Sequence, residues 1–206
     1  MGAVQQQLKF SLDDFMSWEA EQSERHEYIN GEVFAMTGAR DGHNTIAGNL
    51  FAALRSALRG SPCRAFIADM KLRVDVADAA FYPDVMVTCD ARDKKPEADL
   101  AKRHPVLIVE VLSESTAAYD RGLKFEYYRN IDTLKEYLLV EQDRRHADLF
   151  RRLEEDGLWV LYASGAVEDV VLESVGVRLA MDLLYEDVSL PDSATATSSP
   201  SAPAQE

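Results

Sequence analysis

The chain of 206 residues has only two cysteines, Cys63 and Cys89, and they form no CxxC motif. Neither a disulfide scaffold nor a cysteine zinc site is therefore expected, and a reducing interior is the simplest compartment. No apolar run reaches the roughly 18 residues of a membrane span, and the N-terminus lacks the positive and apolar regions of a secretory signal. We expect a cytoplasmic protein that has no membrane partner.

Basic residues are also scarce, since 22 Lys and Arg stand against 36 Asp and Glu, for a formal net charge of -14. This balance argues against a broad basic surface that binds a polyanion passively. It still allows an enzyme that meets a polyanion at one local site. Hydrophobic residues make up 47% of the chain, which favours a folded domain with its own core over a disordered chain.

Several catalytic motifs are absent: GxSxG, GxxxxGK[ST], GxGxxG and HExxH do not occur. The four histidines are scattered and none pairs with another at metal-ligand spacing; they are His26, His43, His104 and His146. These absences give little support to serine-hydrolase, P-loop, dinucleotide-binding or HExxH metalloprotease chemistry.

Helix and strand signals alternate along the chain. Ser11 can cap a short helix over 11–21, and Asn30-Gly31 predicts a hairpin because a type I′ turn needs positive φ at both central residues. Apolar residues spaced by four predict a second helix over 44–59, ahead of Gly60. Strand-like segments follow on both sides of a third predicted helix. This order predicts an α/β or α+β domain with a mixed central sheet flanked by helices.

The third helix is predicted around 120–131, and the closing strands and a last helix run to about residue 188. The charged segment 90–103 reads as a solvated loop. We predict one domain over 1–188 and a disordered tail over 189–206, which is rich in Pro, Ser, Thr and Ala.

Residues 106–112 read VLIVEVL, which is typical of a strand buried on both faces, with one carboxylate, Glu110, among the aliphatic side chains. An ionised carboxylate there is costly unless it is paired, hydrogen-bonded or bound to a metal. Asp84 follows Pro83 at the start of the preceding apolar strand. If the strands are neighbours, the two carboxylates converge at one end of the sheet. Carboxylate-rich sites of this kind suit Mg²⁺.

A metal would also explain how concentrated negative charge is tolerated, because two close carboxylates without a cation would force one to protonate. Lys124 lies fourteen residues after Glu110, in the helix predicted next, and shares a face with Tyr128 four residues on. From there it could return over the same sheet edge, where it could orient a metal-bound water, assist its deprotonation, or offset negative charge in a transition state.

Five segments together resemble one family, the Uma-type family of restriction endonucleases within the PD-(D/E)xK nuclease superfamily. The resemblance covers residues 10 to 188, and each short motif alone is a weak signal. The segments are HEYINGEV at 26–33, HNTIAGNL at 43–50, PDV at 83–85, EVLSEST at 110–116 and Lys124.

The resemblance implies roles for particular positions. Asp84 and Glu110 would be Mg²⁺ ligands, with Mn²⁺ as an alternative metal. The lysine expected two residues after the second acid falls on Leu112, which departs from the superfamily pattern. We predict that Lys124 supplies the ammonium group instead. Glu27 resembles the additional N-terminal acid that many such nucleases bring to the metal.

His43, at the entry to the second helix, is a further catalytic candidate that could contact phosphate or water. Each of the five residues also has a purely structural interpretation. Asp84 could cap a turn, Glu110 could pair with a basic residue, and Lys124 could be a solvated helix lysine. Glu27 could be a cross-strand charge, and His43 a helix-start residue.

The expected function is Mg²⁺-dependent hydrolysis of phosphodiester bonds in DNA. One alternative is a nucleic-acid-binding or assembly module that keeps the nuclease fold without turnover, which Leu112 and the net charge favour. Another is a metal-dependent hydrolase of a different phosphoester. The pairs Arg144-Arg145 and Arg151-Arg152 could contact phosphates or lie on a solvated sheet face. The resemblance is also compatible with a homodimer, because many nucleases of this fold must reach two strands.

Overall fold

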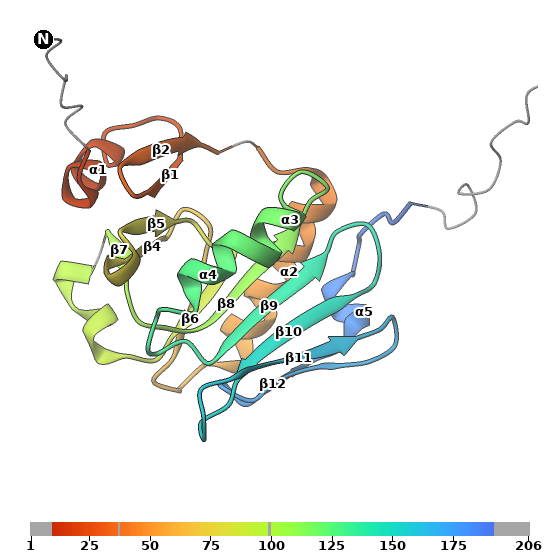
Figure 1. Ribbon diagram of the computed structural model, residues 1–206. Coiled ribbons are helices and arrows are strands. Elements are labelled where there is room, and N and C mark those ends of the chain that lie inside the picture. The colour runs from red at the N-terminus through yellow and green to blue at the C-terminus, as the bar shows by residue number, and fades with distance from the viewer. Residues whose placement is uncertain (1–9, 37, 99, 192–206) are drawn as a thin grey trace, which may run out of the picture.

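The computed structural model describes residues 10–191, except residues 37 and 99. Its main unit is a six-stranded sheet in the order β11-β10-β9-β8-β6-β3 (Figure 1). Neighbouring strands are antiparallel except β8 and β9, which are parallel. The strands are β3 Arg64–Ile67, β6 Val85–Thr88, β8 Pro105–Leu112, β9 Glu136–Glu141, β10 Ala147–Arg152 and β11 Trp159–Ser164. This is the mixed sheet of an α+β domain, as the sequence predicts.

A second sheet has the order β2-β1-β5-β4-β7, and β12 and β13 form a separate hairpin. The turn between β1 and β2 contains Asn30 and Gly31, with φ of 51° and 95°, so the predicted hairpin is confirmed. The strands are β1 His26–Ile29, β2 Glu32–Ala35, β4 Lys71–Val74, β5 Ala79–Phe81, β7 Ala101–Lys102, β12 Val170–Leu172 and β13 Val177–Leu179.

The helices are short apart from α2. Ser11 caps α1 as predicted: its Oγ accepts a hydrogen bond from the Asp14 N–H at 3.1 Å. The third predicted helix is divided into α3 and α4, which are joined by one turn of π-helix over Asp120–Lys124. The helices are α1 Leu12–Glu19, α2 Asp41–Ala57, α3 Ala117–Tyr119, α4 Phe125–Tyr128 and α5 Met181–Leu184. No helix among the described residues has the length and apolar character needed to cross a membrane.

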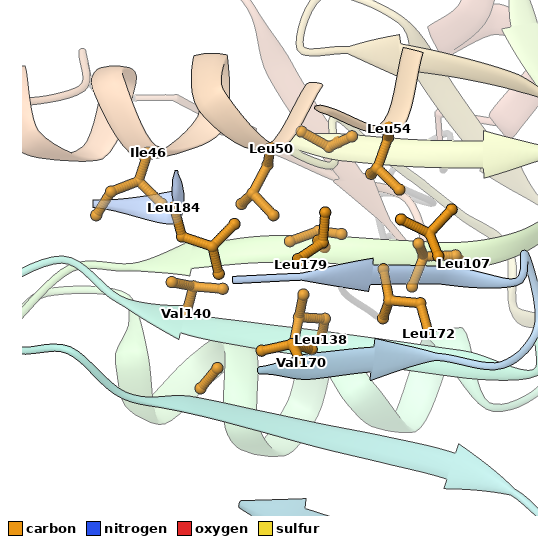
Figure 2. Packing of buried hydrophobic residues seen from close by; sticks show 14 of the residues in the cluster. Ile46, Leu50, Leu54, Leu107, Leu138, Val140, Val170, Leu172, Leu179 and Leu184 are labelled. Carbon is orange, nitrogen blue, oxygen red and sulfur yellow. The ribbon is translucent and has the colours of Figure 1, made fainter. Parts of the chain in front are cut away.

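The six-stranded sheet is covered on both faces, so alternate side chains of β8 enter two different cores. Leu107, Val109 and Val111 pack with α2, α5, β12 and β13. Figure 2 labels Leu107 in this core, together with residues of α2, α5, β12 and β13. Ile108 and Leu112 lie on the opposite face and pack with Tyr128 of α4 and with residues of β4 and β5. Because side chains alternate along a strand, Glu110 points to this second face, where Lys124 also lies.

Segment 90–103 differs from the predicted solvated loop, because it buries two of its charges. Asp93 is 2% exposed and accepts hydrogen bonds from the Thr88 hydroxyl and from the main-chain N–H groups of Arg103 and His104. Lys102 Nζ donates to the carbonyl oxygens of Ala98 and Asp93. The segment is therefore anchored by buried polar contacts. The predicted tail lies outside the described residues from position 192 onward.

The two cysteines also contradict the sequence-based expectation. Cys63 and Cys89 form a disulfide, because β3 and β6 are antiparallel neighbours and place them opposite each other, next to the pair Arg64 and Thr88. The cytoplasmic location predicted from the cysteines consequently loses that support.

Reduction of this bond should lower the free energy of unfolding by about 3–4 kcal/mol, because the bond closes a loop across a separation of 26 residues. Urea unfolding with and without reductant measures the change. The double variant Cys63→Ser/Cys89→Ser is the control and should not respond to reductant. Two titratable thiols in the folded, oxidised protein would contradict the assignment.

Candidate active site

The carboxylates of Asp84 and Glu110 come together where β6 and β8 lie side by side. The register pairs Val85 with Val109, which places Asp84 beside Glu110. The Asp84 N–H donates to Glu110 Oε2 at 3.4 Å, and Asp84 Oδ2 accepts from the Val111 N–H at 2.7 Å. The convergence expected from the sequence is therefore present, while the catalytic and metal-binding roles of both residues stay predictions.

Glu110 is 4% exposed, and its Oε1 has two further donors. Tyr128 Oη donates to Glu110 Oε1 at 2.7 Å, and Lys124 Nζ lies 3.0 Å from the same oxygen. Burial raises the pKa of Glu110 to about 8 against the opposing charge of Lys124, and the nearby charge of Asp84 adds to the rise. The positive charge of Lys124 therefore does not fully compensate the burial of the Glu110 carboxylate and its closeness to Asp84.

Lys124 reaches the site, as predicted, from the π-helical turn that precedes α4. Its Nζ lies 3.2 Å from Glu27 Oε1 and 3.6 Å from Asp120 Oδ1, in addition to Glu110. Burial alone would lower the pKa of Lys124, but the three carboxylates hold it well above its usual value. Lys124 is therefore a buried cation shared by three acids, not a solvated helix lysine.

The side chains at both ends of the π-helical turn lie in the site. Asp120 and Lys124 are four residues apart and both are buried, at 3% and 5% exposed. Tyr137 Oη donates to the Asp120 carbonyl oxygen at 3.0 Å and ties the turn to β9. π-helical turns are frequent at functional sites, and here the turn carries Lys124 onto the face of β8 that holds Glu110.

This placement gives a physical reason for Leu112. Residues 110 and 112 share one face of β8, and Leu112 is 1% exposed in the core beneath α4. The superfamily pattern has a lysine at position 112; here Lys124, in the segment that covers the same face, places its ammonium group 3.0 Å from Glu110 Oε1.

His43 lies in the first turn of α2, and its Nε2 is 2.9 Å from Asp84 Oδ1. Burial would lower the pKa of His43, but the hydrogen bond to Asp84 and the charge of that residue raise it above the usual 6.5. His43 therefore contacts one of the two central carboxylates and is more than a helix-start residue.

We expect the His43 imidazole to titrate above 6.5, and Asp84→Asn to lower its pKa by removing the charged acceptor. Because the folded-state pKa is raised, the stabilisation from His43 is complete below 6.5 and is lost as pH rises through the folded-state value. NMR titration of the ring measures both pKa values. An unchanged midpoint in Asp84→Asn would contradict the pairing.

Glu27 lies on β1, across the cleft from β8. Its Oε1 contacts Lys124 Nζ, and its Oε2 accepts a hydrogen bond from Tyr119 Oη at 3.5 Å. Sequence reasoning did not include Asp120 and Tyr119, and it noted Tyr128 only as a neighbour of Lys124. The four-residue spacing of Asp120, Lys124 and Tyr128 was the available signal, because it puts all three on one side of a helix.

A cleft of about 650 Å³ is lined by Glu27, His43, Asp84, Glu110, Tyr119, Asp120 and Lys124, and its wall also includes Phe34, Arg40, Tyr82 and Ser113. The arginine pairs outside the cleft have acidic neighbours. Arg144 contacts Glu141, Arg145 contacts Asp182, and Arg151 contacts Glu136 and Glu173. Such pairing fits the sheet-face interpretation of these arginines better than phosphate contact.

Within the described residues, no group of three or more His, Cys, Asp or Glu side chains is arranged to hold a metal ion. Mg²⁺, however, keeps several waters and needs only one or two protein carboxylates. Asp84 and Glu110 offer such a pair, whereas Glu27 is directed at Lys124. The donor chemistry therefore fits a hydrated Mg²⁺ on two carboxylates and does not form a three-residue cage.

A mixed sheet flanked by helices, with an aspartate and a glutamate on neighbouring strands beside a buried lysine, defines a nuclease-type domain of the restriction-endonuclease class. The chain belongs to the family described as "Uma2: Putative restriction endonuclease", whose model matches residues 12–182. The resemblance seen in the sequence is thereby confirmed at the level of the family.

Two proteins of Synechocystis sp. are related to the chain. "Uncharacterized protein slr1290" is 36% identical over 181 residues, 88% of this chain and 94% of the relative. "Uncharacterized protein sll1609" is 33% identical over 148 residues, 72% of this chain and 83% of the relative. A crystal structure described as "a putative nuclease belonging to DUF820" from Anabaena variabilis has a TM-score of 0.70 at 18% identity. The similar region covers 85% of this chain and 97% of the Anabaena chain, and the likeness establishes the fold.

Proposed function

We propose that this protein is a Mg²⁺-dependent endonuclease that hydrolyses phosphodiester bonds in DNA. The observation that carries the proposal is the imbalance of charge in the cleft. Glu110, Glu27 and Asp120 share one buried lysine, Lys124, and Asp84 beside them contacts His43. A divalent cation on the Asp84–Glu110 pair would offset the remaining negative charge and allow an anionic phosphodiester to approach.

Asp84 and Glu110 would hold Mg²⁺, which when bound polarises the scissile phosphate and lowers the pKa of water. In the hydrolysis, a water oxygen attacks phosphorus and loses a proton to solvent, the bond from phosphorus to one sugar oxygen breaks, and that sugar oxygen takes up a proton from solvent. Lys124 stays protonated at neutral pH because its pKa is raised. It would therefore stabilise negative charge on the phosphate rather than remove a proton from water.

His43 and Glu27 would have supporting roles. His43 Nε2 positions Asp84 through the 2.9 Å contact, and in its protonated form it can also donate to a phosphate oxygen. Glu27, on β1, contacts Lys124 Nζ at 3.2 Å and would help to keep the ammonium group directed at Glu110. Arg40, in the wall of the same cleft, offers a cation to the substrate phosphates.

Incubation of the purified protein with supercoiled plasmid and with single-stranded DNA tests the proposal. We expect cleavage with Mg²⁺ or Mn²⁺ and none with EDTA. Comparison of the two substrates gives the strandedness. Cleavage that persists in EDTA, or no cleavage with either metal, would reject the proposal.

A second function is favoured by one observation: Leu112 is buried where the superfamily pattern has lysine, so the usual ammonium position is lost. A DNA-binding module without turnover would follow if Lys124 could not replace that group. Such a module would bind DNA in the plasmid experiment and leave it intact with every metal.

A further inference from the structure

A second cavity of about 910 Å³ lies outside the acidic cleft, between the C-terminal part of α2 and β3. Its wall includes Phe51 and Arg55 of α2, Arg59 just after the helix, and Arg64 and Ile67 of β3. We call this cavity the α2–β3 groove. β3 is an edge strand of the six-stranded sheet, with β6 as its neighbour on one side, so its other edge presents main-chain donors and acceptors to the groove.

The groove concentrates positive charge that has no acidic partner. Arg55, Arg59 and Arg64 are exposed, and within the described part of the chain none of the three makes a salt bridge or a side-chain hydrogen bond. Most of the other basic side chains that the structure describes contact an acid, in a chain whose net charge is -14. The acid in the groove wall, Asp69, contacts Arg25 at 3.1 Å. Three guanidinium groups without an acidic partner line this cavity, and that of Arg55 lies 5.9 Å from the centre of the Phe51 ring. Such a concentration of positive charge calls for an anionic occupant.

The groove leads directly to the acidic cleft. Ile67, at the end of β3, pairs with Val85, and the next residue, Ala68, donates its N–H to the Asp84 carbonyl oxygen at 3.0 Å. Asp69 lies in the wall of both cavities. Along an extended strand, Arg64 is about 13 Å from the level of Asp84, at roughly 3.3 Å per residue. One DNA strand carries about four phosphates over that length, at 3.4 Å per phosphate.

We propose that the α2–β3 groove binds the sugar–phosphate backbone of a nucleic acid on one side of the scissile phosphate. Arg55, Arg59 and Arg64 contact successive phosphates, and Phe51 and Ile67 provide the apolar wall against the sugars. The position of the scissile phosphate rests on the proposed function. The binding surface itself rests on the unpaired arginines.

Fluorescence anisotropy with a labelled 20-base-pair duplex in EDTA tests the groove without cleavage. The variant Arg55→Gln/Arg59→Gln/Arg64→Gln should bind more weakly, and the slope of log K against log salt should become shallower by about 2 to 3. This value corresponds to the loss of three phosphate contacts at about 0.9 each. Affinity and slope equal to those of the wild type would overturn the proposal.

The matched control removes three positive charges that are already paired. Arg129, Lys135 and Arg178 contact Glu126, Glu154 and Asp169, so the variant Arg129→Gln/Lys135→Gln/Arg178→Gln should keep the wild-type slope. A control variant that loses as much affinity as the groove variant would overturn the proposal, because net charge alone would then explain the effect. The Lys variant Arg55→Lys/Arg59→Lys/Arg64→Lys keeps the charges and should retain the slope, even if the Gln variant does not fold.

Two further experiments distinguish a nucleic acid from an acidic peptide as the occupant, and the groove proposal from the endonuclease proposal. Poly-glutamate that displaces the duplex at equal charge concentration would indicate an acidic peptide and overturn the nucleic-acid proposal; weak displacement supports it. Arginine-dependent binding by a protein that cleaves no DNA would support the groove and reject the endonuclease. Cleavage that needs Asp84 but is unchanged in the Gln variant would reject the groove and leave the endonuclease standing.

Discussion

Asp84→Asn should reduce the rate of Mg²⁺-dependent plasmid cleavage by at least about 100-fold, the size of effect typical when one group that stabilises transition-state charge is removed. The substitution keeps an oxygen that can accept from the Val111 N–H but removes the negative charge needed to hold the metal beside Glu110. Initial rates of loss of supercoiled plasmid, at saturating Mg²⁺, measure the change.

The same substitution should change the stability little, because relief of repulsion between two adjacent carboxylates offsets the loss of the charged contact to His43. Thermal unfolding in EDTA separates this effect from the loss of activity. Glu155→Gln, at an exposed position on the turn between β10 and β11, is the control for losing one negative charge. Cleavage by Asp84→Asn within a few-fold of the wild type would remove Asp84 from the mechanism.

Lys124→Met should have the largest effect on folding, with a loss of about 3–5 kcal/mol in the free energy of unfolding. The substitution leaves Glu110, Glu27 and Asp120 without their shared cation, and breaking a buried ion pair in this way is strongly destabilising. Denaturant unfolding at neutral pH in EDTA measures the loss. Lys135→Met is the matched control, because Lys135 pairs with Glu154 at an exposed site where such a pair contributes about 0–1 kcal/mol.

The pH dependence gives this prediction a second readout. Burial raises the pKa values of Glu110 and Asp120, and without Lys124 both should rise further. An acid whose pKa is raised in the folded state contributes stability that is complete below its unfolded-state pKa. That contribution is lost as pH rises through its folded-state pKa. The difference between wild type and Lys124→Met should therefore shrink as pH falls from neutral toward 4.5. A difference below about 1 kcal/mol at neutral pH would show that Lys124 is not the cation on which the acids depend.

The local features of the fold could be predicted because each depends on few neighbouring residues. Asn30-Gly31 supplies the positive φ values of a hairpin turn, and Ser11 caps α1 through its own side chain. The aliphatic run around Glu110 identifies a strand covered on both faces, which β8 is. The closeness of Asp84 and Glu110 could be predicted once their two strands were assumed to be neighbours.

The remaining features depend on contacts between distant segments. Cys63 and Cys89 come together through the register of β3 and β6, which no cysteine spacing reveals. Asp93 is buried because distant main-chain N–H groups supply its hydrogen bonds, so a charged segment could not be recognised as partly buried. The sequence suggested Lys124 as the missing ammonium group, but its contacts depend on the π-helical turn and on packing against β8.

The central claim is that Asp84 and Glu110 form a divalent-cation site, and calorimetric titration of the protein with Mn²⁺ tests it most directly. We predict saturable binding of one ion per chain, lost in Asp84→Asn and in Glu110→Gln and kept in Glu155→Gln. The absence of saturable binding to the wild type, or equal binding by all four proteins, would contradict the account.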